Sequence, residues 1–399
     1  MITKKINYNY GGNTGQFNKM SCSLTPCCNK IYRPTWAEIN LKNFQKNIKT
    51  ISSLLKRKTD ILAVVKANAY GHMAIPLSKI AAKSGVKILG VSSLEEGIFL
   101  RDAGIKQKIL ILGSLYPLGS FSVARKYNLV PTVSSENGIR ELSKLALKHR
   151  KTLSFHLKVD TGMGRIGASY QTAEHLIDLI KEKPGIKMEG LYTHFASAGV
   201  DKNFTSRQIK TFKDIVNYAH NNGLKFIAHA GNSSAIFHNK DSHFDMVRPG
   251  LSLYGLVPDR MSAKYKKLQP VLSWKTKIVF LKKVSKGVSI SYGRTFKTKR
   301  PSVIATLPVG YADGYNRGLS NKGYVLIKGK RCPIVGRVTM DMIMADVSKV
   351  KNASVGDEVV LIGKQGKEKI TAEEMAQKVN TINYEIVCNI GSRVPRVLV

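Results

Sequence analysis

Acidic residues are scarce in this chain. Its 399 residues include 26 Asp and Glu against 64 Lys and Arg, which gives a formal net charge of +38. A positive balance of this size indicates nucleic-acid or anionic-membrane binding when the basic residues form one block or stripe. Here they stand singly or in short pairs, as in Lys42, Lys46 and Lys49 or in Lys282 and Lys283. We therefore expect a lysine-rich, solvated surface with weak non-specific affinity for polyanions and no specific nucleic-acid partner.

Cysteine is also rare, and its count is odd. Five cysteines in a chain of this length do not form a disulfide framework, which favours a reducing cytoplasm. Cys22, Cys27 and Cys28 cluster near the start, but no histidine or second cysteine pair lies near them in the sequence. A zinc site there has no further support, and we expect no metal.

Long apolar runs are absent. The longest have the size of a strand, so we expect no membrane-spanning helix and no membrane partner. The first thirty residues are rich in Asn, Lys, Gly and Thr and lack the apolar core of a secretion signal. We interpret residues 1–30 as a disordered basic extension.

Residues 31–268 alternate between short apolar runs and helical patterns. This alternation predicts a closed parallel (β/α)8 barrel of the TIM type. A doubly wound open sheet is the alternative, although it usually has fewer strands in a row. The eight predicted strands are Ile61–Val65, Ile88–Val91, Ile109–Leu112, Leu129–Val133, Leu153–Val159, Met188–His194, Phe226–His229 and Asp245–Arg248.

Helices are predicted from apolar residues at helical spacing. One stripe consists of Leu41, Phe44, Ile48, Ile51 and Leu55, typical of an amphipathic helix. Three further helices of the barrel are predicted at Glu136–Lys148, Gln171–Lys181 and Ser206–Asn221.

Residues 269–399 have a different pattern, in which β-type runs are separated by Gly, Asn and Lys turns. This pattern predicts a separate, mainly-β C-terminal domain with one short helix at Thr371–Lys378. The predicted strands are Val271–Val284, Val303–Leu307, Tyr324–Ile327, Ile334–Val338, Ile343–Val347 and Glu358–Ile362.

Lys66 directly follows the first predicted barrel strand. It separates the apolar run Ile61–Val65 from the polar stretch that begins at Ala67. An amine held at the end of a buried strand can lose its proton and act as a nucleophile or a base. The alternative is a lysine that extends from the strand end into water.

Nine short motifs with polar or glycine residues are spread along the chain. They are Val64-Val-Lys-Ala-Asn-Ala-Tyr-Gly-His72, Lys158-Val-Asp-Thr-Gly-Met-Gly-Arg165, Tyr192-Thr-His-Phe195, Asn232-Ser233, Val247-Arg-Pro-Gly-Leu-Ser-Leu-Tyr-Gly255, Ser291-Tyr-Gly293, Gly310-Tyr-Ala-Asp-Gly-Tyr315, Gly336-Arg-Val-Thr-Met-Asp341 and Arg393-Val-Pro-Arg396. Together they resemble the motifs of the alanine racemases and occur in the order found in that family. The similarity extends from Arg33 to Val399.

The resemblance implies a pyridoxal-phosphate enzyme that interconverts L- and D-alanine for peptidoglycan precursors. Lys66 would carry the cofactor as a Schiff base and then act as the base on one face of the substrate. Tyr292 of a partner subunit would be the base on the other face, since inversion is best served by two opposed acid/base groups. A homodimer with shared active sites follows. Without this motif context, Tyr292 reads as an aromatic residue in a β-turn.

Two alternative functions are kept open. A racemase acting on serine or on several amino acids, or a decarboxylase on the same barrel, is the alternative among enzymes. A basic binding protein without catalysis is the alternative from another class, but it predicts clustered basic residues with interleaved aromatics.

Arg248 matches the arginine that donates to the pyridine nitrogen of the cofactor in this family. Arginine is permanently charged and only a donor, so that it would leave the ring nitrogen unprotonated. From the sequence alone, an ion pair with Asp245 at a strand end is the alternative.

The remaining site residues are also assigned by resemblance. Cofactor contacts are implied for Tyr70, His194, Asn232, Ser233, Gly250, Leu251 and Tyr384. Substrate contacts are implied for Arg165, Met340 and Asp341. Lys158 matches a lysine that is carbamylated in many relatives, and the corridor leading to the site would be lined by Tyr311, Arg317 and Arg337. Two departures from the family are Ala196–Gly199, where an acidic residue is often found, and Ile390–Arg393, which lacks an aromatic residue of some relatives.

Overall fold

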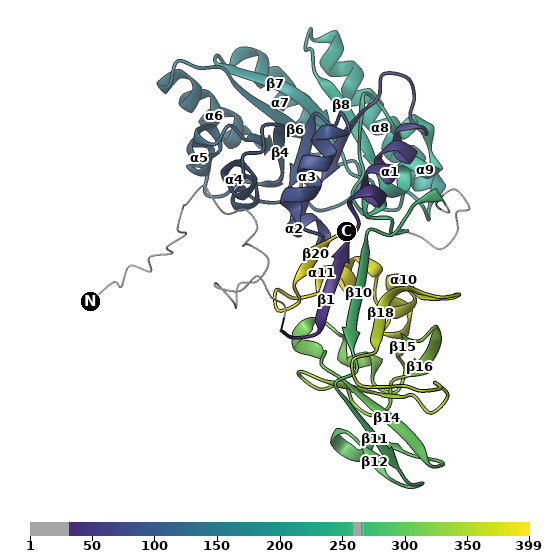
Figure 1. Ribbon diagram of the computed structural model, residues 1–399. Helices are drawn as coiled ribbons and strands as arrows, with labels where there is room; N and C mark the ends of the chain where they lie inside the picture. The colour runs from purple at the N-terminus through teal and green to yellow at the C-terminus, as the bar shows by residue number, and fades with distance from the viewer. Residues whose placement is uncertain (1–31, 258–264, 266) are drawn as a thin grey trace, which may run out of the picture.

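The computed structural model describes residues 32–257, 265 and 267–399 (Figure 1). A helix-covered barrel lies at one end of the molecule and a β-rich domain at the other, with strands β1 and β10 running between them. The predicted extension at residues 1–30, with Cys22, Cys27 and Cys28, lies outside the described residues. Among the helices of the described part, none combines the length and apolar character that a membrane crossing requires.

The barrel prediction is confirmed. Eight parallel strands close on themselves, because β9 pairs with both β8 and β2, with Asp60 opposite Met246. This closure excludes the open sheet. The strands are β2 (Asp60–Val64), β3 (Ile88–Val91), β4 (Lys108–Ser114), β5 (Val130–Val133), β6 (Leu153–Lys158), β7 (Ile186–Tyr192), β8 (Ile227–Asn232) and β9 (Met246–Arg248).

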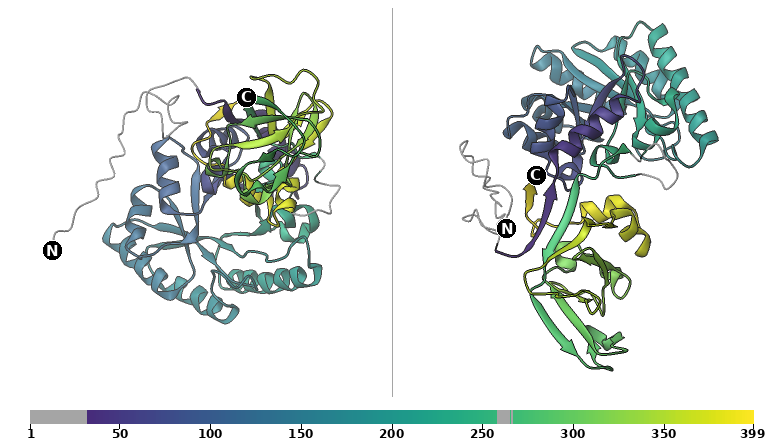
Figure 2. Two further views of the ribbon diagram at one scale, coloured as in Figure 1. Left: turned by 90° about the horizontal axis from the view of Figure 1, so that it is seen from below. Right: turned by 45° about the vertical axis from the view of Figure 1, so that its right-hand side comes forward.

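Helices surround this barrel (Figure 2). The helix α6 occupies its predicted range, with the Ser135 hydroxyl accepting from the amide of Gly138 at its start. The stripe of α1 buries Phe44, Ile48 and Ile51, but the helix ends at Ser52, before Leu55. The helices are α1 (Leu41–Ser52), α2 (Lys66–Tyr70), α3 (Ala74–Lys83), α4 (Leu94–Asp102), α5 (Ser120–Lys126), α6 (Glu136–Lys148), α7 (Tyr170–Glu182), α8 (Lys202–Asn221) and α9 (Ser233–His238).

The C-terminal part of the chain is mainly β, as predicted. A seven-stranded sheet has the order β16-β15-β18-β10-β1-β20, with β19 paired to β18; β11, β14 and β17 form a second sheet, and β12 and β13 a hairpin. The strands are β10 (Leu272–Lys277), β11 (Phe280–Val284), β12 (Ser289–Ile290), β13 (Phe296–Lys297), β14 (Ser302–Leu307), β15 (Tyr324–Ile327), β16 (Lys330–Pro333), β17 (Ile343–Asp346), β18 (Glu358–Gln365), β19 (Glu368–Ile370) and β20 (Arg396–Leu398).

Some predictions for this domain were wrong in detail. The run Val271–Val284 forms two strands rather than one, in different sheets. In the run Ile334–Val338, only Ile334 makes a β-bridge, to Ala345. The short helix is present as α10 (Ala372–Lys378), with the Thr371 hydroxyl as its cap, and is followed by an unpredicted helix, α11 (Asn383–Cys388).

Both ends of the described chain meet in the large sheet. The unpredicted strand β1 (Thr35–Ile39) pairs antiparallel with β10 and parallel with β20. It precedes the barrel in the sequence, yet its hydrogen bonds join it to strands from beyond residue 268. A continuous apolar core, which includes Leu62 of the barrel and Val325 of the β domain, therefore spans both parts of the molecule.

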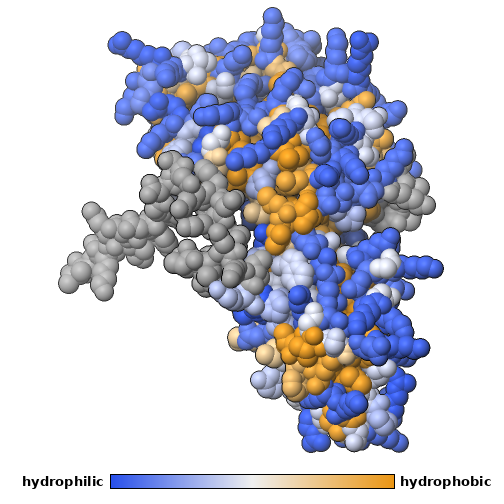
Figure 3. Space-filling view, in the orientation of Figure 1, coloured by the Kyte–Doolittle hydropathy of each residue, from blue (hydrophilic) through white to orange (hydrophobic). Residues whose placement is uncertain are grey.

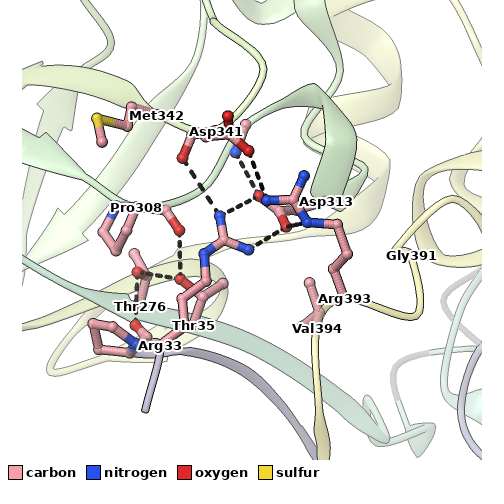
Figure 4. A network of polar contacts seen from close by, with 12 residues as sticks. Arg33, Thr35, Thr276, Pro308, Asp313, Asp341, Met342, Gly391, Arg393 and Val394 are labelled. Carbon is pink, nitrogen blue, oxygen red and sulfur yellow. Dashed lines mark hydrogen bonds and ion pairs between the residues drawn. The ribbon is translucent and has the colours of Figure 1, made fainter. Parts of the chain in front are cut away.

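A buried carboxylate links the segments that precede β1 and β20 to loops of the β domain (Figure 4). The fully buried Asp313 forms a two-pronged ion pair with Arg33 and lies 3.5 Å from Arg393 Nε. Arg393 in turn donates to Asp341 over 2.6 Å. The segment before β1 and the segment before β20 are thus tied to the loops that carry Asp313 and Asp341. Removing one partner from a buried ion pair leaves an uncompensated charge.

Candidate active site

Four of the predicted site residues follow the carboxyl ends of barrel strands. Lys66 follows β2, His194 follows β7, Ser233 follows β8, and Arg248 ends β9. In a parallel barrel these positions share one face, which is where active sites of such barrels form. In Figure 1 the helix α2, which begins at Lys66, lies at the end of the barrel that faces the β domain.

The turn after Lys66 has an unusual backbone. Residues 67–70 all have positive φ, from 51° to 56°, although none of them is glycine. This left-handed conformation costs an L-residue roughly 1–2 kcal/mol. Side chains hold it in place: Glu96 accepts from the amide of Ala67 over 2.7 Å, and Asn68 accepts from the amide of Ala74 over 2.8 Å. Glu96 was not predicted as a site residue.

The Lys66 amine lies in a cationic, largely buried environment. Burial, and after it the charge of Arg165, lowers the pKa of Lys66. A lowered pKa makes more of the neutral amine available, which is the form that attacks a carbonyl carbon. This is the behaviour expected of a nucleophilic lysine, and it argues against an amine that merely extends into water.

Arg248 is buried and makes no pair with Asp245, so the alternative drawn from the sequence was wrong. Asp245 instead accepts from the amide of Ala228 over 2.8 Å. Burial lowers the pKa of Arg248 to about 10. Its Nη2 donates to the carbonyls of Thr193 and Ala230 over 2.6 and 3.1 Å, and its Nη1 donates to His229 Nδ1 over 3.0 Å.

These contacts leave part of the guanidinium available. Arginine has five N–H groups. Two on Nη2 and one on Nη1 of Arg248 have acceptors among the described residues, whereas Nε–H and the second Nη1–H have none. Two N–H groups are therefore free to meet an acceptor above the barrel core.

Two histidines that were not predicted lie behind Arg248. His229 on β8 contacts Arg248, and its Nε2 lies 2.9 Å from Nδ1 of His156 on β6. Tyr192 stacks on His229 with ring centroids 4.7 Å apart. His156 alternates with Phe155 and Leu157, which pack against the helix layer. This two-residue periodicity is the sequence signal from which the inward position of His156 could have been predicted.

Lys158 is the third cation of this region. It is buried, and its ammonium lies 5.3 Å from the ring centroid of Tyr192. Burial, followed by the charges of Arg248 and Arg165, lowers the pKa of Lys158 to about 8. The same charges, with burial as the larger cause, hold the pKa of His194 well below its usual value, so that His194 is neutral.

A corner without side-chain charge lies beside these cations. The Ser233 hydroxyl accepts from the amides of Gly250 and Ser252 over 3.0 and 3.3 Å. A Cβ atom at Gly250 would lie 2.4 Å from the hydroxyl of Tyr70, so only glycine leaves that hydroxyl in place. Burial, and after it Tyr384, raises the pKa of Tyr70, which keeps its hydroxyl a donor.

The other residues predicted for this corner have distinct positions. Tyr384 lies beside Tyr70, with ring centroids 6.0 Å apart. Asn232 caps helix α9 by accepting from the amide of Ala235 over 3.0 Å. Leu251 is buried in the core directly after Gly250. Hydrogen-bond donors and small residues thus converge here. A site that binds an anionic group without a metal ion needs both. The described residues hold no cluster of three or more His, Cys, Asp or Glu that would bind a metal ion.

Among the predicted residues of the β domain, Tyr384 lies near α2, whereas Tyr292 lies far from Lys66 of the same chain. Tyr292 follows β12, which Figure 1 shows at the end of the β domain farthest from the barrel. Its side chain is 73% exposed, and that of Met340 is 53% exposed. Arg294, two residues further along the chain, donates to Ser289 over 3.1 Å.

The other predicted residues of this domain lie in its loops, and Arg337 contacts the turn that carries Tyr292. Arg337 packs against Gly293, and its carbonyl accepts from Ser291 over 2.7 Å. Tyr311 donates its amide to the carbonyl of Thr339 over 3.0 Å. Arg317 is exposed in the next turn, and Asp341 pairs with Arg393.

Two family models match the chain: the alanine racemase N-terminal domain over residues 39–258 and the alanine racemase C-terminal domain over residues 271–398. The chain belongs to the alanine racemase family. It is 48% identical over 369 residues to the alanine racemase of Halothermothrix orenii, covering 92% of this chain and 97% of that one.

Solved structures of alanine racemases have the same fold. That from Clostridium difficile 630 superposes with a TM-score of 0.87 at 39% identity, covering 93% of this chain and 97% of that one. That from Bartonella henselae, which has covalently bound pyridoxal phosphate, has a TM-score of 0.83 at 29% identity over 92% and 99% of the two chains. The chain is thus an enzyme of the alanine racemase family, and racemase activity is supported.

Proposed function

We propose that this enzyme uses pyridoxal phosphate to interconvert L- and D-alanine in the cytoplasm, and that the D-alanine supplies peptidoglycan synthesis. The observation that carries the proposal is the placement of the Lys66 amine and two free N–H groups of Arg248 at one end of the barrel, beside the donor corner of Ser233, Gly250 and Tyr70. The bound cofactor in the Bartonella henselae relative supports it.

The residues present fit this cofactor. The donor corner suits its phosphate, since a Cβ atom at Gly250 would fill the space in front of the Tyr70 hydroxyl. The free N–H groups of Arg248 suit the pyridine nitrogen, which a donor leaves unprotonated. When bound, the cofactor withdraws electrons from the substrate and makes its Cα–H acidic. Lys66 would hold the cofactor covalently and, once freed, move a proton at Cα on one face.

The second base is proposed to come from a partner subunit. A head-to-tail dimer would place Tyr292 of one chain opposite Lys66 of the other, and two-fold symmetry would create two such sites. The exposure of Tyr292 and Met340, at 73% and 53%, supports an interface that includes part of the β domain. Figure 3 shows apolar side chains grouped on the surface of this domain. Met340 and Asp341 would then close the substrate pocket, and Tyr311, Arg317 and Arg337 would line the corridor to it.

Lys158 is proposed to be carbamylated. With its pKa lowered to about 8, a fraction of its amine is neutral near pH 7 and able to react with carbon dioxide. The carbamate would be an anion among the cations of Lys66, Arg165 and Arg248. The charge of Asp160 opposes these cations, because it raises the pKa of Lys158. Arg165 would then be oriented toward the substrate carboxylate by its fork of donors.

Borohydride reduction followed by peptide mapping tests the proposal. Reduction should fix the cofactor on Lys66, and L-alanine should become a mixture of both enantiomers in the untreated enzyme. A label on another lysine, or alanine whose configuration does not change, would contradict it. A panel of L-amino acids separates alanine racemisation from a broader specificity.

A further inference from the structure

Arg248, His229 and His156 form a buried chain that leads away from the proposed cofactor site. Arg248 Nη1 lies 3.0 Å from His229 Nδ1, and His229 Nε2 lies 2.9 Å from His156 Nδ1. Both imidazoles are fully buried. A Cβ atom at Gly190 would lie 2.3 Å from His156 Nδ1, so that the His156 ring depends on a glycine for its place.

The chain allows a single arrangement of protons. Arginine only donates, so Nδ1 of His229 must present a lone pair. His229 then carries its hydrogen on Nε2, and His156 must accept it on Nδ1. Neither ring can take a second proton. A hydrogen on Nδ1 of His229 would face the N–H of Arg248, and one on Nδ1 of His156 would face the Nε2–H of His229. Burial agrees with this, since it lowers the pKa of His156 to about 3 and holds that of His229 well below its usual value.

We propose that His156 is a positioning residue: its Nδ1 accepts from His229 and fixes the ring of His229 with its lone pair toward Arg248. A ring without that partner could turn over while still stacked on Tyr192, and this would replace the acceptor Nδ1 by a carbon atom. Arg248 would then lose the contact that directs its free N–H groups. Because His156 is neutral, it also gives no proton to this chain. The inference rests on the proposed function for the role of Arg248 only.

The first measurement uses ¹⁵N-labelled histidine and nuclear magnetic resonance on the cofactor-free protein. Both His229 and His156 should carry hydrogen on Nε2 and none on Nδ1 at neutral pH. In His156→Phe the signals of His229 should change or broaden. In His156→Gln they should resemble the wild type, because the amide oxygen of glutamine can accept. An Nδ1-bound hydrogen on His229, or a charged His156, would overturn the inference.

The second measurement is the affinity of the cofactor-free protein for pyridoxal phosphate. His156→Phe should bind about tenfold more weakly, as for other residues that orient a ligand-contacting group. Gly190→Ala, which pushes on the His156 ring, should weaken binding in the same direction. His156→Gln should restore it. His243→Phe removes another buried histidine, bonded to the carbonyl of Ile236, and should leave the affinity unchanged.

The outcomes separate positioning from support of the fold. If His156→Phe lowers the unfolding temperature yet binds the cofactor as the wild type does, His156 is only structural and the inference is wrong. If the wild type itself fails to bind pyridoxal phosphate, the proposed function fails, whereas the proton pattern of the two histidines still tests the inference.

Discussion

Arg248 Nη1 lies 3.0 Å from Nδ1 of His229, and the described residues place only neutral acceptors around this buried guanidinium. A buried charge without a carboxylate is costly to the fold. In the proposed function this cost has a use, because no carboxylate competes for the free N–H groups that would meet the cofactor ring. An aspartate partner would have competed for them.

Arg248→Lys should therefore reduce racemisation roughly 100-fold, the scale on which losing one oriented donor acts. A lysine retains the charge, but its ammonium lacks the planar fork that serves His229, Thr193 and the cofactor together. Arg140→Lys is the control, since Arg140 is half-exposed on α6 and pairs with Glu136. Alanine racemisation followed by chiral chromatography measures the effect. Equal rates for both variants would refute the role given to Arg248.

Gly250→Ala should weaken pyridoxal-phosphate binding. The new Cβ atom would lie 2.4 Å from the Tyr70 hydroxyl, so the tyrosine must move by about 1 Å, and a displacement of that size can cost a factor of about 100. Gly119→Ala is a matched control, because a Cβ atom there meets nothing within 4 Å. Adding Tyr70→Phe to Gly250→Ala should relieve part of the clash. Titration of the cofactor-free proteins with pyridoxal phosphate measures the affinity. A Gly250→Ala variant that binds the cofactor as tightly as the wild type would contradict the role given to this corner.

Mixed dimers test whether the site is shared between subunits. Lys66→Ala and Tyr292→Phe should each be nearly inactive. In a random mixture, half of the dimers are hybrids and each hybrid has one intact site, so about a quarter of the wild-type activity should return. Activity that stays at the level of the separate variants, in dimers verified as hybrids, would show that Tyr292 does not act across the interface.

Lys158 gives a pH-dependent signature. Burial lowers its pKa in the folded chain to about 8, from the usual 10.5 of a lysine. Between these values the unfolded chain binds the proton and the folded chain does not, so this lysine makes stability rise with pH. Lys158→Met should thus raise the unfolding temperature of the cofactor-free, carbon-dioxide-free protein most below pH 8. The gain should shrink as the pH rises from 8 toward 10.5. A gain that is constant with pH would contradict the lowered pKa.

Carbamylation of Lys158 has a test of its own. Enzyme equilibrated with ¹³C-bicarbonate should show a carbamate carbon resonance, and Lys158→Ala should lose it. Lys181→Ala is the control, since Lys181 pairs with Asn222 on the protein surface. A wild-type spectrum without the resonance would leave Arg165 without the anion proposed to orient it.

Asp313→Asn should lower the free energy of unfolding by about 3 kcal/mol, because it leaves Arg33 facing a neutral group at a buried junction. Asp102→Asn, at an exposed carboxylate on α4, is the control. Urea titration compares the two. A change no greater than that of the control would mean that the network of Figure 4 adds little to stability.

The sequence predicted best those elements whose signals are local. Helix α6 was predicted at both ends from the helical spacing of its apolar residues, and the structure shows that the Ser135 hydroxyl caps its start. Strand β1 was missed because it depends on distant partners: Ala37 lies opposite Trp274 and Arg396 in the sheet. A five-residue strand with so remote a partner leaves little trace in its own composition.

The candidate active site also combines residues that short motifs reveal with residues whose roles depend on distant contacts. Lys66, Arg248 and the residues of the donor corner were found through motifs, and the structure brings them to one end of the barrel. His156 and Glu96 were missed because their roles depend on contacts, not on neighbours in the sequence. Whether Tyr292 acts across a subunit interface depends on the assembly, which the structure of one chain does not contain.

The left-handed backbone at residues 67–70 has a consequence for chemical synthesis of the protein. Positive φ strains an L-residue but is the relaxed state of its mirror image. D-alanine at position 67 or 69, introduced by ligation of synthetic peptides, should therefore fit this turn better than the natural residue does. D-alanine, one of the two isomers that alanine racemases interconvert, would thus stabilise the turn that directly follows Lys66.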